Sequence, residues 1–195
     1  MAIDTGLAIT CSDLQAAGGI KTLLVRAWAT GDTIVYGSAG THSITSIKDT
    51  GGTDADWGVY EFKNETPALT ITASKENGST SFECGLSFML PKLEVGKSNV
   101  VQDMLNACLM VIAVDNNDKA FVLGVSDKYR NTSVAERSQT FAQLTSVEGG
   151  TGAAYSDESG ITINLVARQF EMPREYIASG SGITVASTGL TATTD

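Results

Sequence analysis

The side chains best suited to catalysis are scarce in this chain of 195 residues, which contains one histidine and three cysteines. His42 precedes Ser43 in a stretch of Gly, Thr and Ser that lacks the G-x-S-x-G pattern of a nucleophilic serine. Cys84 lies in an alternating apolar stretch, and Cys108 lies on the apolar face of a predicted helix. A reactive cysteine needs a basic, partly exposed setting, so both positions indicate core packing and we expect no catalytic residue.

Two polar runs resemble binding loops only in part. Asp115–Lys119 (DNNDK) starts like a calcium loop, but Ala120 and Ser126 stand where that loop needs Gly and Glu. A hairpin turn between two apolar strands explains the run better. Gly149–Gly152 is not followed by the Lys-Ser/Thr of a phosphate-binding loop and indicates an ordinary loop. We therefore expect no metal and no cofactor.

The charge balance of the chain is acidic, with 22 Asp and Glu against 13 Lys and Arg and a formal net charge of −9. Proteins that bind nucleic acid on their own cluster Lys and Arg to neutralise phosphates, so this balance argues against that class. Several acids surround aromatic residues in one stretch, namely Asp54, Asp56, Glu61 and Glu65. This stretch is either a solvated hairpin or an acidic surface that faces a partner or a lumen.

The composition indicates a β-rich, turn-rich chain, with 42% hydrophobic residues, 18% charged residues and 20 glycines. The longest apolar run, Ala107–Val114, is far shorter than the roughly 20 residues that a membrane-spanning helix needs. The cysteines Cys11, Cys84 and Cys108 are odd in number and widely spaced, which favours free thiols in a reducing compartment. The first basic residue is Lys21, so we expect no secretory signal and a protein made and kept in a cytoplasm, or assembled from one.

The elements that would position these side chains are mostly strands. The clearest alternation runs from Phe82 to Leu90 and predicts a strand with one dry face and one wet face. Asn77-Gly78 predicts the hairpin turn that joins it to a preceding strand containing Leu69 and Ile71. Further along, 109–125 predicts a strand–turn–strand hairpin whose first strand is fully buried. Residues 131–144 are predicted as weakly helical, 147–160 as a loop and 161–170 as a strand.

One amphipathic helix is predicted at about 98–109, capped by Ser98 or Asn99. Its apolar face consists of Val101, Met104, Leu105 and Cys108. The pattern as a whole predicts a mainly β fold, an antiparallel β-sandwich or barrel with this helix at its flank, a long loop at 48–56 and extended termini. We divide the chain into an N-terminal arm (1–19), a β domain (20–175) and a C-terminal arm (176–195).

This order of elements resembles the tail tube proteins of tailed bacteriophages and the related tube proteins of contractile injection systems. The opening, from Cys11 through Gly18–Lys21 (GGIK) to Trp28, is similar to the openings of phage virion proteins. The resemblance covers most of residues 10–175.

The resemblance implies a structural role and no enzymatic activity. Six copies would form a ring by pairing strands edge to edge, and stacked rings would form a tube through which DNA passes without specific binding. The partners would be other copies of the chain and other tail proteins, with no membrane involved. The site of action would be the virion tail, after synthesis in the host cytoplasm. Six copies of a −9 chain would give an acidic lumen that repels phosphate if the charge faces inward.

The resemblance also suggests where adjacent rings would meet. Family members clamp neighbouring rings with a long hairpin and terminal arms, which by position correspond to Lys48–Lys63, Met1–Gly19 and Arg174–Asp195. The interface residues expected in these segments are Asp54, Asp56, Trp57, Tyr60, Phe62, Arg174 and Tyr176. Aromatic side chains among them would be anchors, although Trp57 could equally belong to the core of its own chain.

Two other functions remain open at this stage. The chain could be a different phage component, such as a head–tail joining or decoration protein. It could also be a small β-barrel module that binds a ligand or carbohydrate, with Trp28 or Trp57 as a stacking platform. An enzyme is disfavoured because no candidate catalytic residue is left.

Overall fold

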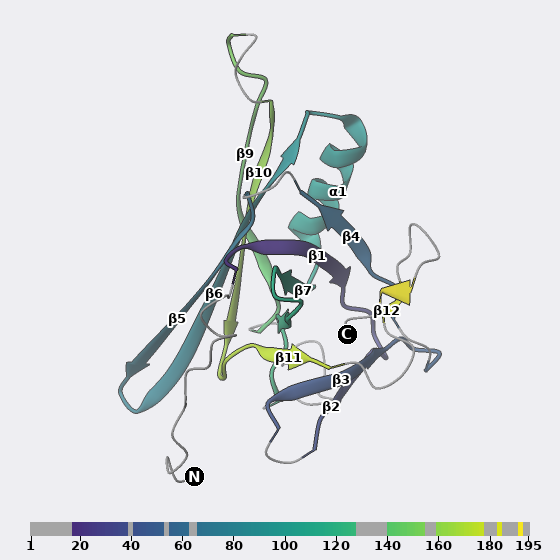
Figure 1. Cartoon of the computed structure of the whole chain (residues 1–195), viewed down its shortest axis with the longest axis vertical. Helices are drawn as coiled ribbons and strands as arrows, with labels where there is room; N and C mark the ends of the chain where they lie inside the picture. The colour runs from purple at the N-terminus through teal and green to yellow at the C-terminus, as the bar shows by residue number, and fades with distance from the viewer. Residues whose placement is uncertain are drawn as a thin grey trace.

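The computed structural model describes residues 17–38, 41–52, 55–62, 66–127, 140–154, 159–177, 183–184 and 191–192. These residues are mainly β, with a single helix among them and two sheets that do not close into a barrel. The expected mainly β class with one helix is confirmed, and the barrel alternative is set aside. A short ladder of β12 (Ile183–Thr184) and β13 (Thr191–Ala192) stands beside the two sheets (Figure 1).

The larger sheet has seven strands in the order β2-β3-β11-β8-β7-β1-β4. Their bounds are Ile20–Ala27 (β1), Thr33–Tyr36 (β2), Ser43–Lys48 (β3), Gly58–Glu61 (β4), Leu109–Asp115 (β7), Ala120–Leu123 (β8) and Arg174–Tyr176 (β11). All neighbours are antiparallel except β11 and β3, which run parallel.

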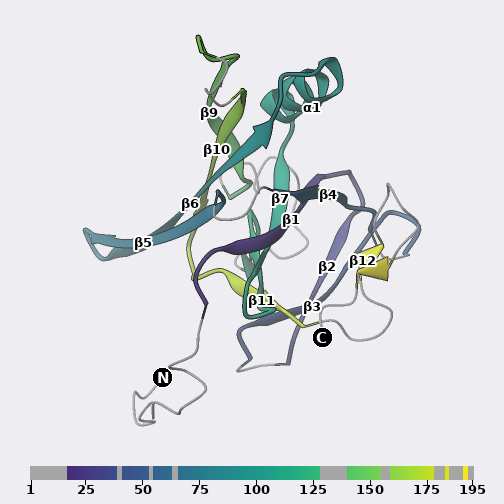
Figure 2. The same cartoon turned by 45° about the horizontal axis from the view of Figure 1, so that its top comes forward.

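The smaller sheet is fully antiparallel, in the order β5-β6-β10-β9. Its strands are Ala68–Glu76 (β5), Ser79–Pro91 (β6), Gln143–Gly150 (β9) and Gly160–Gln169 (β10). The Asn77-Gly78 turn between β5 and β6 is confirmed, with φ of 50° and 81°. Two left-handed residues in succession give the turn a twist that matches the flanking strands, which Asn and Gly tolerate best. Figures 1 and 2 show the β5–β6 hairpin extending away from the larger sheet.

Strand β9 lies where the sequence predicts the end of a helix and the start of a loop. The helix predicted at 131–144 is wrong for the described residues 140–144, and the loop predicted at 147–160 is wrong at 147–150 and at 160, because Gln143–Gly150 pairs with β10. The described residues 151–154 and 159 lie outside the strands, as the loop prediction has them. Residues 131–139 lie outside the described part of the chain. The sequence of β9 is polar and glycine-rich, and most of its side chains are exposed. Its pairing with β10 depends on main-chain hydrogen bonds, which leave no apolar period in the sequence.

Helix α1 (Val95–Asn106) begins and ends three residues earlier than the predicted 98–109. Glu94 occupies the N-cap without a side-chain hydrogen bond, so neither Ser98 nor Asn99 caps the helix. The chain becomes extended at Ala107 because it must enter β7 two residues later. Cys108 therefore lies outside the helix, whereas Val101 and Met104 are buried as expected.

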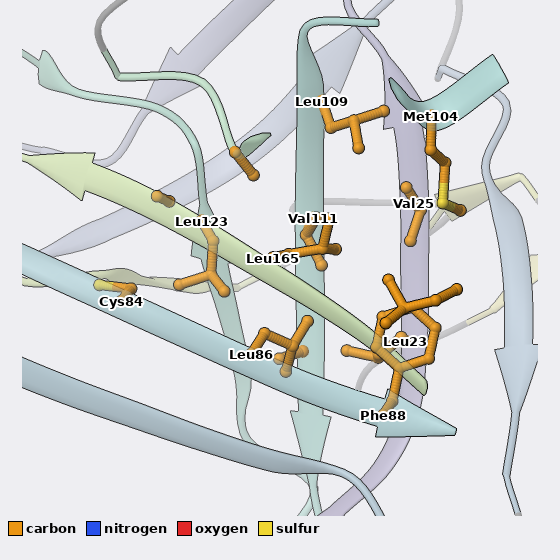
Figure 3. Packing of buried hydrophobic residues seen from close by; sticks show 14 of the residues in the cluster. Leu23, Val25, Cys84, Leu86, Phe88, Met104, Leu109, Val111, Leu123 and Leu165 are labelled. Atoms are coloured by element: carbon orange, nitrogen blue, oxygen red, sulfur yellow. The ribbon is translucent and has the colours of Figure 1, made fainter. Parts of the chain in front are cut away.

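The main core fills the space between the two sheets (Figure 3). The predicted alternation in β6 is confirmed, because every second side chain from Cys84 to Leu90 is buried there. Strands β1, β7 and β10 and helix α1 supply most of the remaining members, which include Leu23, Val25, Val101, Met104, Val111, Ile163 and Leu165. Burial of this apolar surface is the principal force that holds the sheets together.

A second core lies on the other face of the seven-stranded sheet. Ile34, Ile44 and Ile47 of β2 and β3 pack in the same cluster as Met110 and Ile112 of β7, so the sheet curls over its own face. The main-chain N–H of Ala55 donates to the carbonyl of Ile47 at 3.0 Å. This hydrogen bond joins the segment before β4 to β3 and stabilises the curled sheet. Strand β7 is thus covered on both sides, which explains its continuous apolar run.

Candidate assembly surface

The two outer strands of the four-stranded sheet, β5 and β9, form its free edges. Both are long, at 9 and 8 residues, and nearly all their side chains are exposed. An edge strand carries a row of main-chain N–H and C=O groups that no strand of its own sheet pairs. These edges are therefore able to pair with another chain.

Strand β5 leaves an apolar stripe beside its free edge. Leu69 pairs with Leu86 and Ile71 pairs with Cys84, so their side chains point to the core side of the sheet. Leu69 is half-buried and Ile71 is 38% exposed, so the core does not cover these two side chains completely.

Strand β9 carries a matching stripe at the opposite edge. Leu144 pairs with Leu165 and Val147 pairs with Ile163, again on the core side. Leu144 is half-buried and Val147 is 38% exposed, the same fraction as Ile71. The sheet thus ends on both sides in apolar side chains that face one direction and lack a full covering.

The opposite, solvent-facing side of this sheet is rich in hydroxyl groups. Hydrogen bonds join neighbouring strands across it, from Thr72 Oγ1 to the Glu83 carbonyl at 3.3 Å and from Asn164 Nδ2 to Ser146 Oγ at 2.8 Å. The register also places four charged residues on this side, Glu76, Glu83, Glu148 and Arg168. Arg168 forms an ion pair with Glu83, at 3.0 Å between Nε and Oε2. The face therefore carries a net formal charge of −2, a small share of the −9 of the chain.

The interface residues expected between 54 and 62 have different environments. Trp57 is 1% exposed and belongs to the second core, so it offers no surface to a partner. Tyr60 and Phe62 are half-buried against the ring of Phe88, with centroid distances of 6.3 and 5.2 Å. Burial raises the pKa of Tyr60 above its usual value. Asp56 is exposed, whereas Asp54 lies outside the described residues.

Arg174 and Tyr176, the two expected interface residues on β11, face inward. The Arg174 guanidinium donates to both carboxylate oxygens of Glu171, at 3.1 and 3.0 Å, and to Asp127 at 3.2 Å. It also lies over the Tyr36 ring at 5.2 Å. The hydrogen bonds to Glu171 are the main cause that raises the pKa of Arg174. Tyr176 is buried in the second core, so the contacts described for these two residues of β11 lie within their own chain.

The six expected residues that the structure describes therefore do not form one surface. Ile71 and Val147, which lie at the two opposite edges of the four-stranded sheet, are not among the expected residues. The alternation around Ile71 was visible in the sequence, but nothing there shows that β5 is an edge strand. No pattern in the sequence marks Val147, because the polar, glycine-rich stretch around it predicts a loop.

Two of the side chains considered above for catalysis are His42 and Cys84. His42 forms a hydrogen bond within its own chain, and Cys84 is buried. The Nε2 atom of His42 donates to the carbonyl of Met172 at 2.7 Å. Burial, and secondarily the charge of Glu83, raises the pKa of the Cys84 thiol to about 11. Within the described ranges, no group of three or more His, Cys, Asp and Glu residues could hold a metal ion. No helix in that part of the chain is long and apolar enough to span a membrane.

Neither a protein-family model, nor a curated protein, nor a solved structure matches this chain. The geometry of the sheet edges is therefore the observation on which a function rests.

Proposed function

We propose that this chain is a structural subunit that assembles head to tail with copies of itself into closed rings, and that stacked rings form the tube of a phage tail. The observation that carries the proposal is the pair of exposed edges, β5 and β9, on the four-stranded sheet. No catalytic step is part of this function.

The directions of the strands are compatible with a head-to-tail arrangement. Along the order β5-β6-β10-β9 each neighbour is antiparallel, so β5 and β9 run in opposite directions. When the β9 edge of one copy meets the β5 edge of the next, the alternation continues without a break. Such an interface uses two different surfaces, and repetition of it closes into a ring when the rotation between copies allows.

Apolar burial would add to the main-chain pairing. Leu69 and Ile71 on β5 and Leu144 and Val147 on β9 all lie on the core side of the sheet. In a continued sheet the two stripes would lie next to each other. The pairing would satisfy the free edge groups and cover the apolar side chains in one step.

The solvent-facing side of the sheet is the proposed conduit wall. Its hydroxyl groups and its net charge of −2 per copy provide no cluster of bases for phosphates to bind. DNA would pass without specific binding, with only mild repulsion from the wall. The role in a virion tail, and contacts with other tail proteins, belong to this proposal.

The alternatives have less support. A head–tail joining or decoration protein could use the same edges, and the shape of the assembly separates it from a tube. For a ligand-binding module, a hollow lined by Ile34, Tyr36 and Phe141 has about 10 Å³, which is room for one water molecule. Trp57 is buried, and Trp28 packs on Phe141 at 5.8 Å, so neither is an open stacking platform.

The test is electron microscopy and light scattering of the purified full chain with three matched variants. Ile71→Lys and Val147→Lys each place a charge on one edge of the four-stranded sheet. Val35→Lys is the control, because Val35 is 39% exposed on β2, an edge strand of the other sheet. We expect six-fold rings or hollow filaments from the natural chain and from Val35→Lys, and monomers from the other two.

Mixing the two edge variants gives a sharper result. The Ile71→Lys chain keeps an intact β9 edge, and the Val147→Lys chain keeps an intact β5 edge. A one-to-one mixture should therefore form dimers and nothing larger. A natural chain that stays monomeric at high concentration would overturn the proposed function, and rings that tolerate both edge variants would overturn the assignment of the edges.

A further inference from the structure

The turn between β5 and β6 exposes an asparagine amide to water. Asn77 is the only asparagine of the chain that a glycine follows, and both Asn77 and Gly78 are exposed. A side chain at Gly78 would meet nothing within 4 Å, so the turn stands in open space. Within the described part of the chain, the Asn77 side chain has no hydrogen-bond partner. Its amide is therefore free to rotate toward the main chain that follows it.

An asparagine in the turn between β7 and β8 shows the opposite arrangement. Nδ2 of Asn117 donates to the Ala17 carbonyl at 2.8 Å and to Asp115 Oδ2 at 3.1 Å, and its Oδ1 accepts from the Ala17 N–H at 2.8 Å. The next residue is Asp118, whose side chain crowds the main-chain nitrogen that glycine leaves open. The Asn117 amide is thus held on both atoms, whereas the amide of Asn77 is held on neither.

The end of the β5–β6 hairpin lies beyond the core that could keep the turn closed. Every residue from Thr70 to Ser81 is exposed, and the first buried side chain of β6 is that of Cys84. Figures 1 and 2 show this end of the hairpin projecting away from the rest of the molecule. Local opening costs least where few apolar contacts are lost. We therefore expect the strand pairs next to the turn to open readily.

We propose that the Asn77-Gly78 turn is a site of spontaneous covalent modification, at which water converts the Asn77 amide to aspartate and isoaspartate. When the turn opens, the main-chain nitrogen of Gly78 gives its proton to hydroxide and attacks Cγ of Asn77. The new N–C bond closes a succinimide ring, and the side-chain nitrogen takes up a proton and leaves as ammonia. Water then opens the ring at one of its two carbonyls. The inference does not depend on whether the chain assembles.

The isoaspartate product would change the hairpin, because it adds a carbon atom to the main chain of a two-residue turn. The turn depends on the left-handed φ angles of Asn77 and Gly78, 50° and 81°, which match the twist of the flanking strands only at the natural spacing. The pair that closes the turn is Glu76–Ser79. We expect this pair to be lost after modification, and both products add a negative charge beside Glu76.

Incubation of the folded full chain at mildly alkaline pH, followed by tryptic digestion and mass spectrometry, tests the proposal. The peptide Glu76–Lys92 contains Asn77, and the peptide Ser98–Lys119 contains asparagines that no glycine follows, so it is the internal control. Conversion of the first peptide should be at least about tenfold faster and should rise with hydroxide concentration. Its product should separate into two forms of equal mass, of which a protease specific for aspartate cleaves only one.

A second comparison uses the chain unfolded in urea and the variant Asn77→Gly. Because the hairpin end opens readily, the folded chain should convert within about tenfold of the rate of the unfolded chain. Asn77→Gly keeps a residue suited to the left-handed turn and has no amide, so it should give no product. A folded chain that stays unmodified, whether or not the unfolded chain reacts, would overturn the proposal.

Hydrogen exchange measures the effect of the modification on the hairpin. Amides next to the turn should lose protection in step with the isoaspartate fraction of an aged sample, whereas those of β7 should not change. An aged sample of Asn77→Gly, treated in the same way, is the control. Protection that stays equal in modified and fresh chains would overturn the expected loss of the closing pair.

Discussion

Arg26 and Asp32 form a two-pronged ion pair at the end of β1, and the Asp32 side chain is completely buried. Arg26 Nη2 lies 2.9 and 3.1 Å from the two Asp32 oxygens, and Nε lies 3.2 Å from the second. Arg26 also donates from Nη1 to the carbonyl of Asp56 at 3.0 Å. The pair thereby joins the β1–β2 connection to the segment that leads into β4.

Asp32→Asn should lower the free energy of unfolding by about 3 kcal/mol, because it leaves the Arg26 charge without its buried counterion. Urea unfolding followed by circular dichroism measures the change. Glu83→Gln is the control, since its ion pair with Arg168 is exposed on both sides and should contribute less than about 1 kcal/mol. Equal effects of the two substitutions would contradict the role assigned to burial.

Gly124→Ala should destabilise the fold by about 3 kcal/mol, through overpacking and backbone strain together. Gly124 has a φ of +85°, and a Cβ there would lie 2.6 Å from the Leu109 carbonyl and 2.8 Å from the Ala142 nitrogen. Gly52→Ala separates the two causes, because Gly52 has a φ of +76° and nothing within 4 Å. The Gly52 variant should lose only about 1 kcal/mol. Thermal unfolding of both variants gives the comparison.

The Cys84 thiol should resist alkylation in the folded chain. With its pKa raised to about 11, about one thiol in a thousand is ionised at pH 8. Iodoacetamide should therefore label Cys84 only after unfolding, as mass spectrometry of tryptic peptides would show. Rapid labelling of the native chain at pH 8 would contradict the burial of this residue.

The raised pKa of the Cys84 thiol also means that the folded chain should lose stability at high pH. The folded pKa lies above the ordinary 9.0 of a thiol, so the unfolded chain ionises first as the pH rises. The contribution of the buried, neutral thiol to the free energy of unfolding is therefore fully present below about pH 9 and declines as the pH approaches 11. Urea midpoints of the natural chain should fall over this interval more than those of Cys84→Ala.

Charge reversal on the hydroxyl-rich face should make an assembled tube retain DNA. Glu83→Lys together with Glu148→Lys changes this face by four units of charge per copy, from −2 to +2. Binding of a DNA duplex should appear at low salt and weaken steeply as salt rises. The control, Glu94→Lys with Asp103→Lys, makes the same change of total charge at helix α1. Equal DNA retention by both pairs would mean that this face does not line the conduit.

Elements whose side chains alternate, or whose turns need special backbone angles, could be predicted from local patterns of residues. The strand from Phe82 to Leu90, the Asn77-Gly78 turn and the buried run that became β7 could all be predicted, because each depends on local period or local φ. The class of fold followed from these. The helix was predicted with a shifted start, since no side chain caps Glu94 and the boundary is set by where β7 must begin.

Which strands are neighbours and which are edges depends on long-range pairing and could not be predicted from local patterns. A period of two shows that Ile71 shares a face with Leu69, but whether that face is covered depends on strands far away in the chain. The burial of Trp57 and the existence of β9 were decided in the same way, by the curl of one sheet and by pairing with β10. The candidate assembly surface lies at these edges because long-range pairing ends there.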